Sequence, residues 1–204
     1  TRGHVLVDGV DVRDLDPGEL RSLIGMVPQD PFLFSTTIEE NIGLGLDLGA
    51  EASDPDEAVA EAARVAQLHE SIQEFPRRWR TLLGERGVNL SGGQKQRTTL
   101  ARAVARDPRI LVLDDALSAV DTHTEARILD DLTRVMEGRT SFIISHRVSA
   151  VMNADLILVL DGGRIVERGR HPDLIAIGGT YARLLHRQML EQDIEATVVG
   201  AAGD

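Results

Sequence analysis

Residues 90–94 spell LSGGQ and stand directly before a long helix-forming stretch, an arrangement that could hold a phosphate group. Glycine has no Cβ, so the backbone at Gly92 and Gly93 can approach a ligand closely. The first amides of a helix point outward and carry the positive end of its dipole, which favours anions. The serine and the two glycines therefore predict a phosphate-binding turn.

Carboxylate, imidazole and amide side chains follow three apolar runs elsewhere in the chain. Asp114 and Asp115 end the run ILVL, His146 follows the run FIIS, and Gln29 follows the run IGMVP. Open α/β sheets place ligand chemistry at the ends of their strands. A carboxylate there can hold Mg²⁺, commonly through water. These residues predict a site for a phosphate group and its metal ion.

Taken together, LSGGQ, ILVLDD, IISH and VPQD resemble the motifs of the ATP-binding cassette (ABC) ATPases, and the resemblance covers nearly the whole chain. It implies an α/β fold with the core of a P-loop NTPase. It also implies a partial nucleotide-binding domain over residues 1–190, with a helical subdomain at about 38–106 that carries LSGGQ. ATP and Mg²⁺ are the implied cofactors.

The resemblance also implies roles for single residues. Asp114 and Gln29 would serve the metal ion, and Gln29 would link the nucleotide state to a membrane domain. Asp115 would polarise the attacking water, and His146 would touch the γ-phosphate. Residues 118–121, SAVD, resemble a loop of the family that crosses a dimer interface. The residues implied to contact the nucleotide are Ser91, Gly92, Gly93, Gln94 and Asp121.

Two departures from the family pattern affect the expected activity. The family commonly has glutamate where this chain has Asp115, and the shorter side chain would sit an ångström or more from the productive position. A misplacement of about 1 Å can cost on the order of a hundredfold in rate. The chain also has no GxxxxGK[ST] phosphate loop, since Lys95 is its only lysine. We therefore expect a cassette without its first strands and phosphate loop, which binds ATP poorly alone.

Two further segments indicate the subclass of ABC protein. Residues 81–87, TLLGERG, resemble a loop of exporter-type cassettes that lies before the signature motif. Residues 32–34, FLF, follow Gln29 and are expected to pack against a coupling helix of a membrane domain, although a turn with core aromatics is the ordinary alternative. Both segments favour an exporter.

Periodicity and turn signals predict the elements that position these residues. A hairpin is expected over 3–12 around Asp8-Gly9, and Asp16 and Pro17 mark a helix start. Helices are expected at 37–42, 54–68, 94–106, 125–136, 173–177 and 181–190, and strands at 24–27, 110–113, 141–145, 155–160 and 164–167. We expect a disordered tail over 191–204, where the residues are small and polar.

Composition excludes several classes of function. The 204 residues suffice for one sizeable domain, and the net charge is −11 with a pI near 5.0. An acidic surface argues against broad nucleic-acid binding and against direct contact with anionic lipid. The chain has no cysteine and no apolar run near the ~18 residues of a membrane span.

The sequence therefore predicts the ATP-binding and hydrolysing domain of an ABC exporter, with a slow or degenerate site of its own. The expected partners are a second nucleotide-binding domain, in a head-to-tail heterodimer, and the coupling helices of a transmembrane domain. That domain would hold the chain at the cytoplasmic face of the cell membrane. A non-transport ABC ATPase of the DNA-repair or translation type, and a regulatory cassette without turnover, are the alternatives.

Overall fold

The computed structural model describes residues 3–46, 54–87 and 89–201, with the backbone alone for Arg86 and residues 192–201. The chain forms two compact units, Thr1–Ile144 and Ser145–Asp204. Each unit has its own cluster of buried apolar side chains. The candidate residues of the sequence therefore divide between the two units, with His146 in the second.

The first unit begins with the predicted hairpin of β1 (Leu6–Val7) and β2 (Val10–Asp11). Asp8 and Gly9 form its turn with φ angles of 49° and 83°. Two positive φ angles are the requirement of a type I′ turn, which Asp-Gly satisfies. The sequence signal at Asp8-Gly9 is confirmed.

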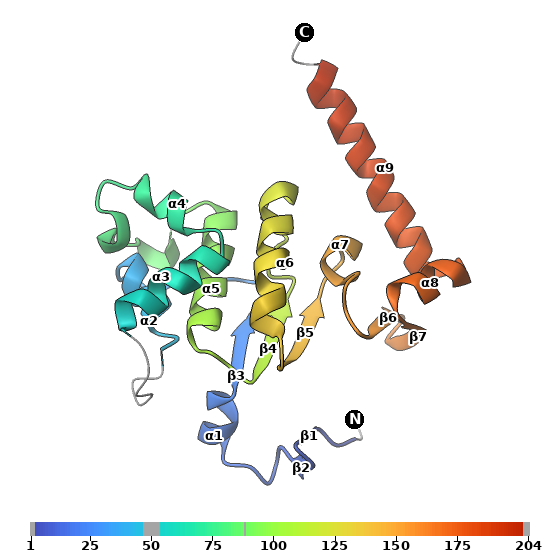
Figure 1. The fold of residues 1–204 in the computed structure, drawn as a ribbon, viewed down its shortest axis with the longest axis horizontal. Coiled ribbons are helices and arrows are strands. Elements are labelled where there is room, and N and C mark those ends of the chain that lie inside the picture. Colours follow the sequence, from blue (N-terminus) through green and yellow to red (C-terminus); the bar gives the residue numbers. More distant parts are fainter. Residues whose placement is uncertain (1–2, 47–53, 88, 202–204) are drawn as a thin grey trace. The chain divides into compact units, whose positions relative to one another are not determined.

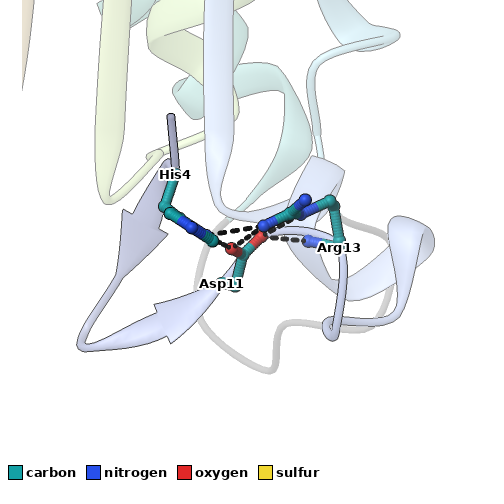
Figure 2. Close-up of polar contacts among 3 residues, drawn as sticks. All are labelled: His4, Asp11 and Arg13. Atoms are coloured by element: carbon teal, nitrogen blue, oxygen red, sulfur yellow. Dashed lines mark hydrogen bonds and ion pairs between the residues drawn. The ribbon is translucent and has the colours of Figure 1, made fainter. Parts of the chain in front are cut away.

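A polar cluster closes this hairpin (Figure 2). Nε of Arg13 donates to Oδ1 of Asp11 at 2.9 Å, and Nη2 donates to Oδ2 at 2.6 Å. Nδ1 of His4 lies 2.6 Å from Oδ2 of Asp11. The hydrogen bonds from Arg13, and then that from His4, hold the pKa of Asp11 far below its usual range. The contribution of this carboxylate to stability is therefore present above its ordinary pKa of about 4 and is lost progressively as the pH falls from there toward the lowered value.

Three parallel strands form the main sheet of the first unit, in the order β3 (Ile24–Val27), β4 (Ile110–Asp114), β5 (Thr140–Ile144) (Figure 1). In the ladder, Val27 pairs with Leu113, and Asp114 pairs with Ile144. The carboxyl ends of the strands consequently lie side by side. The short helix α1 (Pro17–Ser22) precedes β3 and starts at the predicted Asp16 cap, whose Oδ1 accepts from the backbone of Gly18 at 2.8 Å.

Helices α5 (Gly92–Ala105) and α6 (Thr122–Met136) share a core cluster with the sheet. Leu111 and Leu113 of β4 are buried in that cluster, together with Leu100 of α5. On the opposite face of the sheet, Met26 and Phe142 are 52% and 55% exposed. Within the first unit, the core therefore lies on the face of the sheet that carries Leu111 and Leu113.

Between β3 and β4, the described residues form helices and 3₁₀ turns, and the helical subdomain at about 38–106 stays a prediction. The N-terminal cap of α2 is Thr37, whose side chain forms a capping box with Glu40. A short helix from His69 was not expected, because its first residue has no capping side chain to signal it. The elements before α5 are α2 (Ile38–Gly43), α3 (Pro55–Val65), α4 (His69–Gln73) and the 3₁₀ turns η1 (Arg78–Arg80) and η2 (Glu85–Gly87).

The second unit contains α7 (Val148–Val151), the strands β6 (Ile157–Asp161) and β7 (Arg164–Gly169), and the helices α8 (His171–Ile177) and α9 (Thr180–Ala201). Gly162 and Gly163 turn β6 directly into β7, with φ angles of 54° and 74°. β6 therefore pairs antiparallel with β7 in a separate sheet. The predicted strand at 155–160 exists, but it does not join the parallel sheet.

Helix α9 continues to Ala201, into the segment for which we expected a disordered tail from residue 191. The side chains after Glu191 and residues 202–204 lie outside the described part, and the disorder of the tail stays a prediction. Within the described residues, no helix combines the length and the apolar character needed to cross a bilayer.

Candidate functional site

The LSGGQ sequence folds into the N-terminus of α5, and we call residues 91–94 the glycine turn. Ser91 is the N-cap, with φ −65° and ψ 162°. Its Oγ accepts from the backbone N–H of Gln94 at 3.2 Å, and the Gln94 side chain accepts from the backbone N–H of Ser91 at 3.0 Å. This reciprocal pair is a capping box, which fixes the first turn of the helix.

The capping box leaves two backbone donors at the glycine turn. Among the hydrogen bonds of the described residues, none uses the N–H of Gly92 or Gly93, and Gly92 is exposed. A helix start always has such unpaired amides, and they favour anions from solvent or from a partner. The geometry is thus suited to the predicted phosphate contact.

The two glycines differ in the atoms that an added Cβ would meet. A Cβ on Gly93 would stand 2.8 Å from the carbonyl oxygen of Ala119, whereas a Cβ on Gly92 would stand 3.4 Å from the Ala119 methyl group. The first distance is a clash with backbone, and the second is an ordinary contact. Gly93 is therefore required by packing, while Gly92 is free of that constraint.

This difference predicts opposite effects on stability. Gly93→Ala should lower the free energy of unfolding by about 1–3 kcal/mol, because the Ala119 backbone must move. Gly92→Ala should stay within about 0.5 kcal/mol of the wild type. Denaturant unfolding of both variants measures the difference, and equal stabilities would contradict the close approach to Ala119.

Asp114 and Asp115 lie at the carboxyl end of β4, as predicted, and both are half-buried. We call residues 114–121 the acidic loop. Asp115 has a left-handed φ of 47°, which is uncommon for a residue with a side chain. Its N–H donates to the carbonyl oxygen of Ile144 at 2.8 Å. The backbone at the candidate carboxylate is therefore held in one specific conformation.

The donor set at this edge suits Mg²⁺. Gln29 follows β3 and is exposed, and β3 and β4 are neighbours in register, so Gln29 and Asp114 follow adjacent strand ends. Among the described residues, no group of three or more His, Cys, Asp or Glu could hold a metal ion. Mg²⁺ commonly binds through one or two carboxylates plus water and substrate phosphates. One carboxylate and one amide therefore fit a metal ion that arrives with its phosphate ligand.

Asp121 is the N-cap of α6. Its Oδ1 accepts from the backbone N–H of Thr124 at 2.9 Å, and this bond, followed by one from the Thr124 side chain, lowers the pKa of Asp121. A carboxylate at this place also interacts favourably with the helix dipole. The observed contact is a structural cap, and the predicted contact of Asp121 with nucleotide stays a prediction.

His146 follows β5 in the chain and is exposed, but it belongs to the second compact unit. Its predicted role at the γ-phosphate rests on the sequence motif alone.

The segment after Gln29 combines core and surface residues. Leu33 is 1% exposed and lies in the main core, so the expectation that all of 32–34 meets a partner is wrong for Leu33. Phe32 and Phe34 are exposed and touch edge to face, with ring centroids 5.0 Å apart. The guanidinium of Arg102 lies 5.6 Å from the Phe34 centroid and donates to the Phe32 carbonyl oxygen at 2.9 Å.

The exporter-type segment 81–87 lies beside this aromatic pair in the fold. The N–H of Leu83 donates to the carbonyl oxygen of Thr36 at 2.8 Å, and the N–H of Ile38 donates to that of Thr81 at 3.1 Å. These bonds form a short antiparallel bridge between two segments that are distant in sequence. They bring the exporter-type segment next to residues 36–38, which follow the aromatic pair in the chain.

Three buried or half-buried polar residues form hydrogen bonds around the site but were not identified from the sequence. They are Asn41, Gln96 and Arg102. Asn41 is fully buried and accepts from Arg102 Nη2 at 2.8 Å, and Gln96 is 3% exposed. The sequence does contain a signal for Gln96, which is a polar residue on an apolar helix face. Its face of α5 also carries the buried Leu100 and Ala103. Buried polar groups need partners, so such positions indicate a hydrogen-bond network.

Comparison with known proteins agrees with the motifs. A family model described as ABC transporter matches residues 1–118. Heavy metal tolerance factor 1 of Caenorhabditis elegans is 46% identical over 200 residues, which is 98% of this chain and 24% of that protein. The mitochondrial potassium channel ATP-binding subunit of Xenopus tropicalis is 49% identical over 192 residues, which is 94% of this chain and 27% of that protein.

A solved structure of a bacterial Atm1-family ABC exporter with ATP bound matches the fold with a TM-score of 0.85 and 41% identity, covering 92% of this chain and 32% of that one. The chain thus spans only about a quarter to a third of the length of these relatives. The family model covers more than half of the chain, and the α/β fold and the glycine turn agree with it. The chain belongs to the ABC transporter family.

Proposed function

We propose that this chain is the nucleotide-binding domain of an ABC exporter, and that its glycine turn completes an ATP site on a second such domain. The two domains would face each other head to tail and bind ATP and Mg²⁺ between them. The observation that carries the proposal is the pair of unpaired amides at Gly92 and Gly93, held at the exposed start of α5 by the capping box of Ser91 and Gln94.

The chain's own sequence supports a shared site. It has an intact glycine turn, whose backbone donors at the start of α5 suit a phosphate group. A turn that adds donors to a phosphate held by another domain fits this composition. ATP bound between two domains would also draw them together, since each ligand contact then depends on both partners.

Attachment to a membrane domain is supported by an exposed apolar surface. Phe32, Phe34 and Leu82 are 52%, 46% and 59% exposed, and the short bridge joins residues 36–38, just after the two phenylalanines, to residues 81–83. Exposed apolar groups gathered in one place mark interaction surfaces. We propose that the coupling helices of a transmembrane domain dock here, which would place the chain at the cytoplasmic face of the cell membrane. The relatives include a heavy metal tolerance factor and an Atm1-family exporter, in agreement with transport.

We further propose that the site containing this chain's Asp115 is slow and that the pair is a heterodimer. Asp115 stands where the family commonly has glutamate, and its carboxylate is one methylene closer to the backbone. Because a base must lie within hydrogen-bond reach of its water, the shorter side chain should lower hydrolysis there. His146 and Gln29 would complete this site, which would mostly hold ATP.

Nucleotide binding by this chain alone gives the first test. Without a phosphate loop, we expect no ATP affinity tighter than the millimolar range in the presence of Mg²⁺. Isothermal titration calorimetry measures this directly. Micromolar binding would show that the chain holds ATP by itself, and the shared-site proposal would then fail.

ATPase activity of the full-length protein gives the second test. Assembled with its partner and its membrane domain, the protein should hydrolyse ATP and require Mg²⁺. Removing Mg²⁺ with a chelator should abolish turnover. A purified, folded assembly without Mg²⁺-dependent hydrolysis would contradict the proposed function.

A further inference from the structure

The buried side chain of Gln96 connects the glycine turn to the acidic loop. The proposed function assigns these two segments to different ATP molecules. Gln96 lies on α5 just after the glycine turn and is 3% exposed. Its Oε1 accepts from the backbone N–H of Ala119 at 2.8 Å. Its Nε2 donates to Oγ of Ser118 at 2.9 Å and lies 3.4 Å from the carbonyl oxygen of Asp115.

These contacts act on the backbone of the acidic loop. The Asp115 carbonyl oxygen also accepts from the N–H of Ser118 at 3.2 Å and from its Oγ at 3.0 Å. Gln96 therefore belongs to the network that closes the turn after the left-handed Asp115. A left-handed residue with a side chain persists only where surrounding bonds hold it, and Gln96 supplies bonds from a different element.

A second contact makes the connection between the two segments rigid. The backbone of Gly93 approaches Ala119 so closely that a Cβ there would lie 2.8 Å from its carbonyl oxygen. Ala119 is thus held on one side by Gly93 and through its N–H by Gln96. The glycine turn and Gln96 sit on consecutive turns of one helix, so neither can move without displacing the acidic loop.

We propose that Gln96 is a positioning residue that couples the glycine turn to the orientation of Asp115, and so links the two ATP sites of the dimer through a single chain. This inference rests on the proposed function, in which the glycine turn serves the partner's ATP while Asp115 faces this chain's own. When ATP draws the glycine turn into place, Gln96 transmits the shift to the Asp115 and Ala119 backbone. It does so without touching nucleotide.

The test compares Gln96→Met with Thr99→Val in the full-length protein. Methionine keeps the length of the side chain and removes both polar contacts. Thr99 is also buried on α5, at 3% exposure, but its Oγ1 donates only to Lys95 of the same helix, so Thr99→Val controls for loss of a buried polar group. Hydrogen–deuterium exchange is read at the Ala119 amide, and steady-state ATPase gives kcat and KM.

For Gln96→Met we expect Ala119 exchange to rise at least tenfold. Because Gly93 packs against Ala119, the glycine turn should also lose its position at the partner's working site, so kcat should fall at least tenfold, with KM for ATP within threefold. Thr99→Val should change each quantity less than twofold. Gln96→Glu keeps an acceptor for the Ala119 N–H and removes the donor, so it should restore protection of that amide to within threefold of the wild type.

Unchanged Ala119 exchange in Gln96→Met would overturn the proposed link. A raised exchange with an unchanged kcat, or a change confined to KM, would overturn the positioning role. A wild-type protein that hydrolyses no ATP would instead refute the proposed function, while the exchange measurement would still decide whether Gln96 holds the two segments together.

Discussion

Gly92→Asp in the assembled exporter should reduce ATP hydrolysis by a hundredfold or more. The new carboxylate would stand at the exposed start of α5, where the unpaired amides of Gly92 and Gly93 are proposed to meet the partner's γ-phosphate. It would place negative charge against negative charge and remove the stabilisation of developing charge, which in other enzymes costs about 10²–10³ in rate for one donor. Steady-state ATPase of the purified pair measures the loss.

The structure indicates that Gly92→Asp should not destabilise the fold. Among the described residues, a Cβ at position 92 meets the Ala119 methyl group alone, at 3.4 Å, so the aspartate has room. Negative charge in the first turn of a helix favours folding, and the melting temperature should not fall. Gly92→Ala serves as the neutral control and should lower turnover less than tenfold. Unchanged turnover in Gly92→Asp would refute the shared site.

Asp115→Asn should change the turnover of the pair by less than twofold, whereas the corresponding change at the partner's glutamate should reduce it at least a hundredfold. The reason is the proposed division of work, in which the partner's site hydrolyses and this chain's site mostly holds ATP. Asparagine is a suitable probe because it tolerates the left-handed φ of 47° as aspartate does. The substitution therefore removes the charge and leaves the backbone in place.

Asp115→Glu completes the comparison. If the short side chain is what slows this site, the longer carboxylate should raise single-turnover hydrolysis at it. A drop of a hundredfold or more in the pair carrying Asp115→Asn would show that Asp115 is a working catalytic base. The asymmetric account would then be wrong.

The sequence predicts the local elements well because their signals are local. The turn at Asp8-Gly9, the cap at Asp16 and the apolar run 110–113 each depend on side chains within a few residues. The placement of Asp114 and Gln29 at one sheet edge also follows, because parallel strands end together. These features are confirmed by the fold.

Other features depend on contacts between distant residues, which a single sequence does not contain. The bond between Gln96 of α5 and Ala119 of the acidic loop joins residues 23 apart, and that between Arg102 and Phe32 joins residues 70 apart. The pairing of β6 with β7 is local by contrast, since Gly162 and Gly163 turn one strand directly into the other. The roles of His146, Asp121 and Asp115 in catalysis stay predictions, since they require the nucleotide and the partner.

Cross-linking across the proposed dimer tests the central claim most directly. The chain has no cysteine, so Ala119→Cys introduces a single thiol beside the glycine turn in this chain. A second cysteine is placed next to the partner's phosphate loop in an otherwise cysteine-free partner, and disulfide formation is followed with and without ATP and Mg²⁺. The account predicts a cross-link that forms at least tenfold faster with ATP. No cross-link under either condition, or equal rates in both, would contradict it.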